Sequence, residues 1–111
     1  MIVTPSAEVI GYRPVQTLGL VRGNTIRTRH LGRDILAGLK HMVGGEIEGY
    51  TKMMAESREQ AIDRMVAEAR TLGATAIVNV RFATSYLMSG AAEILVYGDA
   101  VKLSRGSGGL S

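Results

Sequence analysis

The chain has 111 residues, with 13 Lys or Arg against 10 Asp or Glu, and it contains no cysteine. This length fits one domain, and the lack of cysteine excludes disulfides, thiolate metal sites, iron–sulfur clusters and cysteine nucleophiles. The apolar runs are far shorter than the ~20 residues of a membrane span. No basic segment followed by an apolar stretch opens the chain, so we expect no signal peptide and a cytoplasmic protein.

The net charge of +3 and the isoelectric point of 9.6 raise the question of nucleic-acid binding. A loose basic stretch runs from Arg22 to Arg33 and includes His30. The chain has only four tyrosines and one phenylalanine, and none alternates with these arginines as a base-stacking platform requires. We therefore expect a solvated or inter-subunit basic face and no nucleic-acid partner.

Residues 1–29 are rich in Val, Ile, Thr and Leu, with Gly and Pro between them, which predicts strands. Within this region, residues 15–28 fit two structures. They form either one bent strand or a hairpin that turns at Gly23-Asn24.

Two helices are predicted in the middle of the chain from apolar residues spaced at 3.6 per turn. A short one covers residues 31–43 and ends at Gly44-Gly45, and a longer one runs from Tyr50 to Leu72 and ends at Gly73. The apolar stripe of the longer helix consists of Met54, Ala61, Ile62, Met65, Ala69 and Leu72. Arg58 falls within this stripe, either with its charged head reaching water or in an ion pair with another subunit.

Residues 75–103 return to strand character. Ala76, Val78, Val80 and Phe82 alternate with more polar neighbours, which predicts one apolar face. A turn at Ser89-Gly90-Ala91 and a partner strand over Ile94–Lys102 follow. We therefore predict a single α+β domain over residues 1–103, an antiparallel sheet with two helices, and a flexible Gly/Ser tail over residues 104–111.

The positive mean hydropathy of +0.13 is unusual for a small monomeric domain, and it predicts a homo-oligomer. Small-molecule sites often form at subunit interfaces. Arg33 and Asp34, at the start of the first helix, and Tyr50, at the start of the second, are the candidate binding residues. Their alternative roles are structural, since an acid in a first helical turn complements the helix dipole.

Metal binding and catalysis have weaker signals. His30 and His41 would lie about 16 Å apart on one helix, too far to share an ion within a chain. Asp34 lies four residues after His30, but two ligands do not make a site. Glu46 and Glu48, repeated around a ring, could gather carboxylates for a hard divalent cation. The chain shows no nucleophile or phosphate-loop motif, so an enzyme that uses such interface carboxylates with a divalent cation is the alternative to a binding module.

The order of several motifs resembles that of a known family. They are Leu18–Gly23, Arg33-Asp34, Gly44-Gly45, Tyr50, Ala61 and, as the most specific stretch, Ala69–Val80. The sequence is similar to the YbjQ-like family, whose name carries the label "putative heavy-metal-binding". The resemblance implies a dodecin-like α+β subunit in a closed homo-oligomer, a pentamer, without an established activity. We therefore expect a binding or interaction module for metal ions or a small ligand at subunit interfaces.

Overall fold

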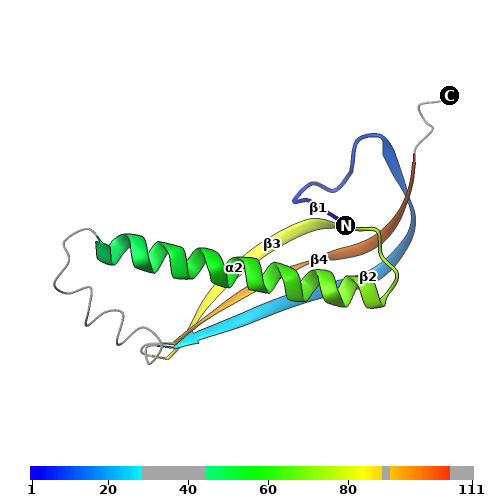
Figure 1. The fold of residues 1–111 in the computed structure, drawn as a ribbon. Coiled ribbons are helices and arrows are strands. Elements are labelled where there is room, and N and C mark those ends of the chain that lie inside the picture. The colour runs from blue at the N-terminus through cyan, green and yellow to red at the C-terminus, as the bar shows by residue number, and fades with distance from the viewer. Residues whose placement is uncertain (29–44, 89–90, 106–111) are drawn as a thin grey trace.

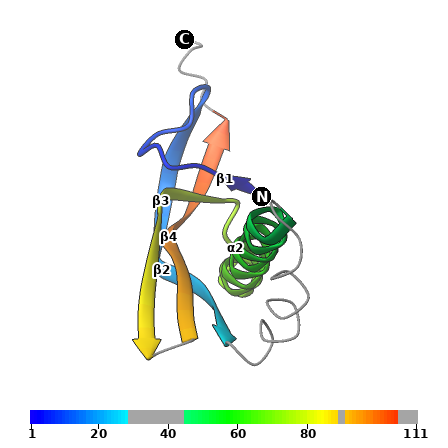
Figure 2. The same ribbon diagram turned by 90° about the vertical axis from the view of Figure 1, so that its left-hand side faces the viewer.

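One long helix lies across one face of a four-stranded sheet in the computed structural model (Figures 1 and 2). The structure describes residues 1–28, 45–88 and 91–105. Its elements are β1 (Ile2–Val3), β2 (Tyr12–Thr28), α2 (Gly45–Thr71), β3 (Ala76–Met88) and β4 (Ala91–Arg105). The predicted α+β class is confirmed. The predicted short helix over residues 31–43, the turn residues 89–90 and the tail beyond Arg105 lie outside the described residues.

The sheet is mixed, with strand order β1-β3-β4-β2. β4 pairs antiparallel with β2 and β3, whereas β1 runs parallel to β3 and pairs Ile2 with Ala76. The prediction of a purely antiparallel sheet was therefore wrong at β1. The β2 strand and the α2 helix separate these paired residues in the chain, and such a long connection allows a parallel pair.

The α2 helix begins at Gly45, so the prediction that it starts at Tyr50 was wrong. Its end agrees with the prediction. Gly73 adopts a positive φ of 80°, and its N–H donates to the Arg70 carbonyl at 3.0 Å. The Ala74 N–H donates to the Ala69 carbonyl at 3.1 Å, which completes a glycine C-terminal cap.

One stripe of α2 packs against the sheet. Ala61, Met65 and Ala69 are fully buried there, and Ser57 extends the stripe by a turn. Arg58 is exposed, which agrees with a charged head that reaches water. The stripe passes through the neighbouring Ser57 instead, where a small side chain suits a helix close to a sheet. An inter-subunit ion pair of Arg58 stays a prediction.

The β2 element is one continuous strand, which excludes the hairpin at Gly23-Asn24. Irregular pairing between Pro14 and Gln16 and between Thr17 and Gly19 marks two bulges that bend it. Gly23 has a packing role: a Cβ there would lie 2.5 Å from the Met65 backbone nitrogen and closer still to the Ala61 carbonyl oxygen. The missing side chain allows α2 to approach β2.

The predicted apolar alternation of β3 breaks at Asn79, which has a positive φ of 54°. β3 places one extra residue between its pairs Val78–Asp99 and Arg81–Tyr97, which is a β-bulge. Before the bulge, Ile77 joins the core beneath α2, and after it Val80 does so. Ala76 and Val78 instead pack with Val101, Ile2, Val9 and Leu103 in a second core on the other face of the sheet.

The molecule is elongated, with extents of 62 × 24 × 18 Å. Its radius of gyration is 18.1 Å, against about 13 Å for a compact domain of this length. Among the described residues, no helix is both long and apolar enough to cross a membrane. Because the molecule is elongated, its core is small relative to its surface.

Candidate functional site

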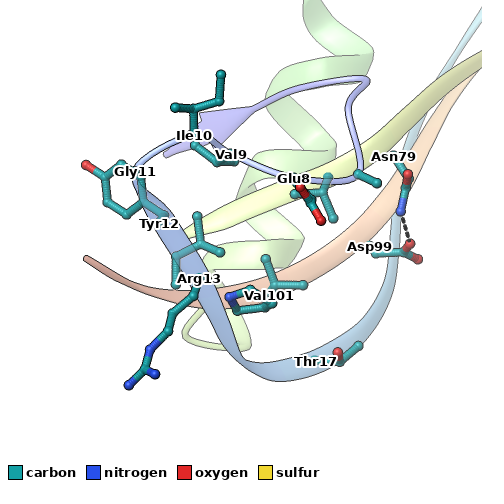
Figure 3. Close-up of a pocket in the computed structure, with 14 residues that line it drawn as sticks. Glu8, Val9, Ile10, Gly11, Tyr12, Arg13, Thr17, Asn79, Asp99 and Val101 are labelled. Atoms are coloured by element: carbon teal, nitrogen blue, oxygen red, sulfur yellow. Dashed lines mark hydrogen bonds between the residues drawn. The ribbon is translucent and has the colours of Figure 1, made fainter. Parts of the chain in front are cut away.

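A concavity of about 600 Å³ opens where the N-terminal segment folds over the sheet face opposite α2 (Figure 3). The segment crosses the second core and then turns back into β2 (Figure 2). The concavity is lined by Ala7, Glu8, Val9, Ile10, Gly11, Tyr12, Arg13, Pro14, Thr17, Val78, Asn79, Asp99, Val101 and Leu103.

The N-terminal segment is anchored by hydrogen bonds to β3. The Thr4 N–H donates to the Ile77 carbonyl at 3.0 Å, and the Val80 N–H donates back to the Thr4 carbonyl at 3.1 Å. At the bulge, the Asn79 N–H donates to the Ser6 carbonyl at 3.0 Å. The Arg81 guanidinium adds a bond to the Pro5 carbonyl at 2.9 Å. These bonds fix the wall of the concavity just before residue 7.

Two polar side chains from the sheet meet in the concavity. The Asn79 amide donates from Nδ2 to Asp99 Oδ2 at 3.1 Å, and both residues are half-buried. The bulge permits this contact, because Asn tolerates the left-handed backbone conformation better than most residues. Thr17 of β2 lines the same concavity.

The charges around the concavity are unevenly placed. Glu8 and Arg13 are both exposed, and neither makes a hydrogen bond or ion pair within the described part of the chain. Figure 3 shows the Glu8 side chain on the same side as Asn79 and Asp99, while the Arg13 guanidinium extends away from them. Two carboxylates and one guanidinium therefore line the concavity, with the guanidinium directed away from the carboxylates.

The sequence-predicted site residues are elsewhere. His30, Arg33, Asp34 and His41 lie outside the described residues. The other three fall in the first turns of α2. They are Glu46, Glu48 and Tyr50. The described lining of the concavity includes none of these candidates, and whether they come together with one another stays a prediction.

The sequence held two weak signals for the site that was missed. Asn79 interrupts a strand of apolar residues, and Asn is one of the few residue types that bulges accept at positive φ. Asp99 stands between Gly98 and Ala100 in another apolar strand. The bulge that joins these two side chains has no sequence pattern that would have paired them in advance.

Comparison with known proteins places this fold in a family. A family model described as "Putative heavy-metal-binding", YbjQ, matches residues 1–104. The chain belongs to this family. A UPF0145 protein of Methanoculleus marisnigri is 58% identical over 103 residues, covering 93% of this chain and 96% of the relative. A UPF0145 protein of Thermus thermophilus is 55% identical over 103 residues, covering 93% of this chain and 90% of the relative.

A solved structure shares the fold of this YbjQ family member. It is a protein of unknown function from Pediococcus pentosaceus, assigned to the DUF74 family, with a TM-score of 0.64 and 14% sequence identity. The match covers 94% of this chain and 98% of the other. The family model and the similar UPF0145 proteins confirm the family resemblance that the sequence motifs predicted.

The heavy-metal description of the YbjQ family finds no matching donor set within the described residues. Soft metals prefer thiolates, and the whole chain has no cysteine. Among the side chains that the structure describes, no group of three or more His, Asp or Glu is close enough to hold an ion. A protein-bound zinc ion usually has three or four protein ligands, so this part of one subunit does not fit a heavy metal.

Proposed function

We propose that this YbjQ family member is a homo-oligomeric binding or interaction module. In this module, identical subunits join edge to edge in a ring and hold a small ligand near their interfaces. The proposal is carried by one observation, the apolar surface that β3 leaves exposed. Phe82 is 48% exposed and Tyr86 is 81% exposed, although both lie in a strand of the sheet.

The outer edges of the sheet support this assembly. β1 covers the edge of β3 only at Ala76 and Ile77, so β3 from Arg81 onward has no neighbouring strand on that side among the described residues. On the opposite edge, β2 is disrupted in its first half by Pro14 and two bulges, which protect an edge from pairing. From Leu20 to Thr28 its pairing with β4 is regular. Strand addition is therefore favoured at these two stretches.

The two edges are different surfaces, which favours a ring over a symmetric dimer. Pairing of one subunit's β2 with the next subunit's β3 is a heterologous contact, and such contacts close into rings when the rotation between subunits allows it. α2 lies over β2 and β4 (Figure 2). The neighbour's α2 would then cover Phe82 and Tyr86. The family resemblance leads us to expect five dodecin-like subunits.

A ligand near the interface follows from the position of the concavity. Pro14 and Thr17 line it and belong to the first half of β2, and the neighbouring subunit is expected on the second half of the same strand. An enzyme that uses interface carboxylates with a divalent cation gains no support from the described residues, which contain no metal-holding group.

Native mass spectrometry of tag-free protein tests the proposal. We expect one closed oligomer, a pentamer, and added mass at fixed stoichiometry when a ligand co-purifies. A monomer at micromolar concentration contradicts the module. A bare oligomer supports the assembly and removes the support for a tightly held ligand.

A further inference from the structure

We propose that the sheet face opposite α2 binds single-stranded nucleic acid, with one base stacked on Tyr97 and phosphates held by Arg22 and Arg81. The inference goes beyond the proposed small-ligand module and does not depend on the ring, because all three side chains belong to one subunit. Strand addition at the edges of the sheet uses backbone groups that lie in the plane of the sheet, so it leaves this face open.

The register of the sheet places these three side chains in one row. Tyr97 of the central strand β4 pairs with Arg22 of β2 on one side and with Arg81 of β3 on the other. The residue before each of them lies in the core beneath α2, so the row points to the opposite face. The Cβ atoms of directly paired residues are about 5 Å apart, so one arginine stands on each side of the tyrosine. The chain order does not show this row, because the three residues are distant in the sequence.

The tyrosine of this row is open to a ligand. Tyr97 is 36% exposed although it belongs to the central strand, and both arginines are exposed. The N-terminal segment packs on the second core, further along the same face, and α2 lies on the other side of the sheet (Figure 2). An aromatic side chain on an open surface can stack with any base, because every base has a π-face.

The carboxylates that β4 places on this face, Glu93 and Asp99, are bound by amides. Glu93 Oε2 accepts from Asn24 Nδ2 at 2.9 Å, and Asp99 Oδ2 accepts from Asn79 Nδ2 at 3.1 Å. Neither carboxylate forms an ion pair with an arginine of the row within the described part of the chain. The positive charge of the row is therefore available to an anion from outside.

The two arginines also keep donors for such an anion. Arg81 donates from one nitrogen to the Pro5 and Val80 carbonyls, both at 2.9 Å, and these neutral acceptors fix its position. Arg22 makes no hydrogen bond or ion pair in residues 1–28, 45–88 and 91–105. A guanidinium has five N–H donors, so each arginine can still bind a phosphate group.

Two arginines around one ring favour a strand over a free nucleotide. A nucleotide within a strand has a phosphodiester on each side of its sugar, whereas a nucleoside monophosphate has one phosphate group. β2 and β3 are two strand spacings apart, about 10 Å, so the arginines can bind phosphates on both sides of one stacked base. A duplex keeps its bases stacked inside, so it offers phosphates but no base to Tyr97.

The test measures binding of a fluorescein-labelled oligothymidylate to the intact protein by fluorescence anisotropy at several salt concentrations. We expect saturable binding at low salt, and the logarithm of the binding constant should fall with the logarithm of salt concentration, with a slope of about −0.7 for each phosphate contacted. The competitors are a duplex of the same length, polyphosphate and thymidine monophosphate. Each should compete at least about tenfold more weakly than unlabelled oligothymidylate, because base stacking or one phosphate contact is lost.

Variants assign the two contributions. Arg22→Gln should weaken binding several-fold and lower the salt slope by about 0.7, because one phosphate contact is lost. Arg58→Gln removes the same charge from an exposed position on α2, and this matched control should leave binding within about twofold. Tyr97→Leu should weaken binding about tenfold, whereas Tyr97→Phe keeps the ring and should bind within about twofold of the wild type. Circular dichroism reports the fold of each variant.

Each remaining outcome overturns the inference. Absence of binding at low salt removes the site, and equal losses in Arg22→Gln and Arg58→Gln indicate a general attraction by charge. Equal competition by polyphosphate shows that the row holds phosphates without a base. Equal competition by the duplex or by thymidine monophosphate assigns the row to that ligand. If Tyr97→Leu fails to fold, the comparison of Arg22→Gln with Arg58→Gln still decides, because both arginines are exposed.

Discussion

The two sides of the central strand β4 are packed very differently. On the β2 side, α2 lies so close that Gly23 has no room for a side chain, and Val21, Ala61 and Met65 are fully buried. On the β3 side, beyond the bulge, Phe82 and Tyr86 remain largely exposed although they belong to the same sheet.

This difference shows that α2 covers β2, β4 and the start of β3, and that it leaves Phe82 and Tyr86 further along β3 uncovered. The side chains of a sheet face are usually buried in a soluble protein when they are large and apolar. Here the uncovered strand is also an edge strand, so its backbone groups and its aromatic side chains lack a partner at the same place among the described residues. A second chain can supply both, and three sets of variants test whether the two sides differ in this way.

The largest effect is expected for Gly23→Ala. The added methyl would overlap the Ala61 carbonyl and the Met65 nitrogen, which are backbone atoms and cannot rotate away. Overpacking of this kind costs about 3 kcal/mol of unfolding free energy. Chemical denaturation at a fixed subunit concentration measures it.

Gly98→Ala is the control on the same sheet. Its added methyl would first meet a methyl of the Ile77 side chain, at 2.7 Å, and we expect a cost of about 1 kcal/mol. Equal losses in the two variants would contradict the close approach of α2 to β2.

The next effect concerns assembly. Replacement of both aromatic residues, Phe82→Asp with Tyr86→Lys, should abolish the oligomer while each subunit stays folded, because both side chains are exposed in the single chain. Light scattering coupled to size-exclusion chromatography reports the mass, and circular dichroism reports the fold. Ile10→Asp, at a 99% exposed position outside these edges, is the control. An unchanged mass for the double variant would show that β3 does not form the interface.

The smallest effect lies at the boundary between the two sides, where the bulge turns β3. Asn79→Ala should lower the unfolding free energy by about 1–2 kcal/mol, because an alanine backbone is strained at positive φ and because the hydrogen bond to Asp99 is lost. Asn79→Gly relieves the strain and loses only the bond. In thermal unfolding, the melting temperature should be highest with Asn at position 79, lower with Gly and lowest with Ala. A lower melting temperature for Gly than for Ala would contradict strain at this position.

Local patterns in the sequence predicted the elements that depend on local physics. The end of α2 at Gly73 and the pairing of β3 with β4 follow from capping and alternation. The predicted start of α2 was wrong, because the helix begins at Gly45 and continues through Gly49. The parallel β1 pair and the bulge at Asn79 depend on residues that are distant in the chain. For the same reason the concavity, which Glu8 and Asp99 both line, was not predicted.

The position of β4 at the centre of the sheet also constrains how the chain folds. β2 and β3 both pair with β4, which follows them in the sequence, and β2 therefore has no strand partner until β4 is present. Such long-range pairing slows folding. During synthesis β2 would emerge as an unpaired strand that exposes Leu20 and Ile26, and α2 is the element that can shield its other face first. The helix is therefore the first element that can bury one face of β2 before the sheet forms.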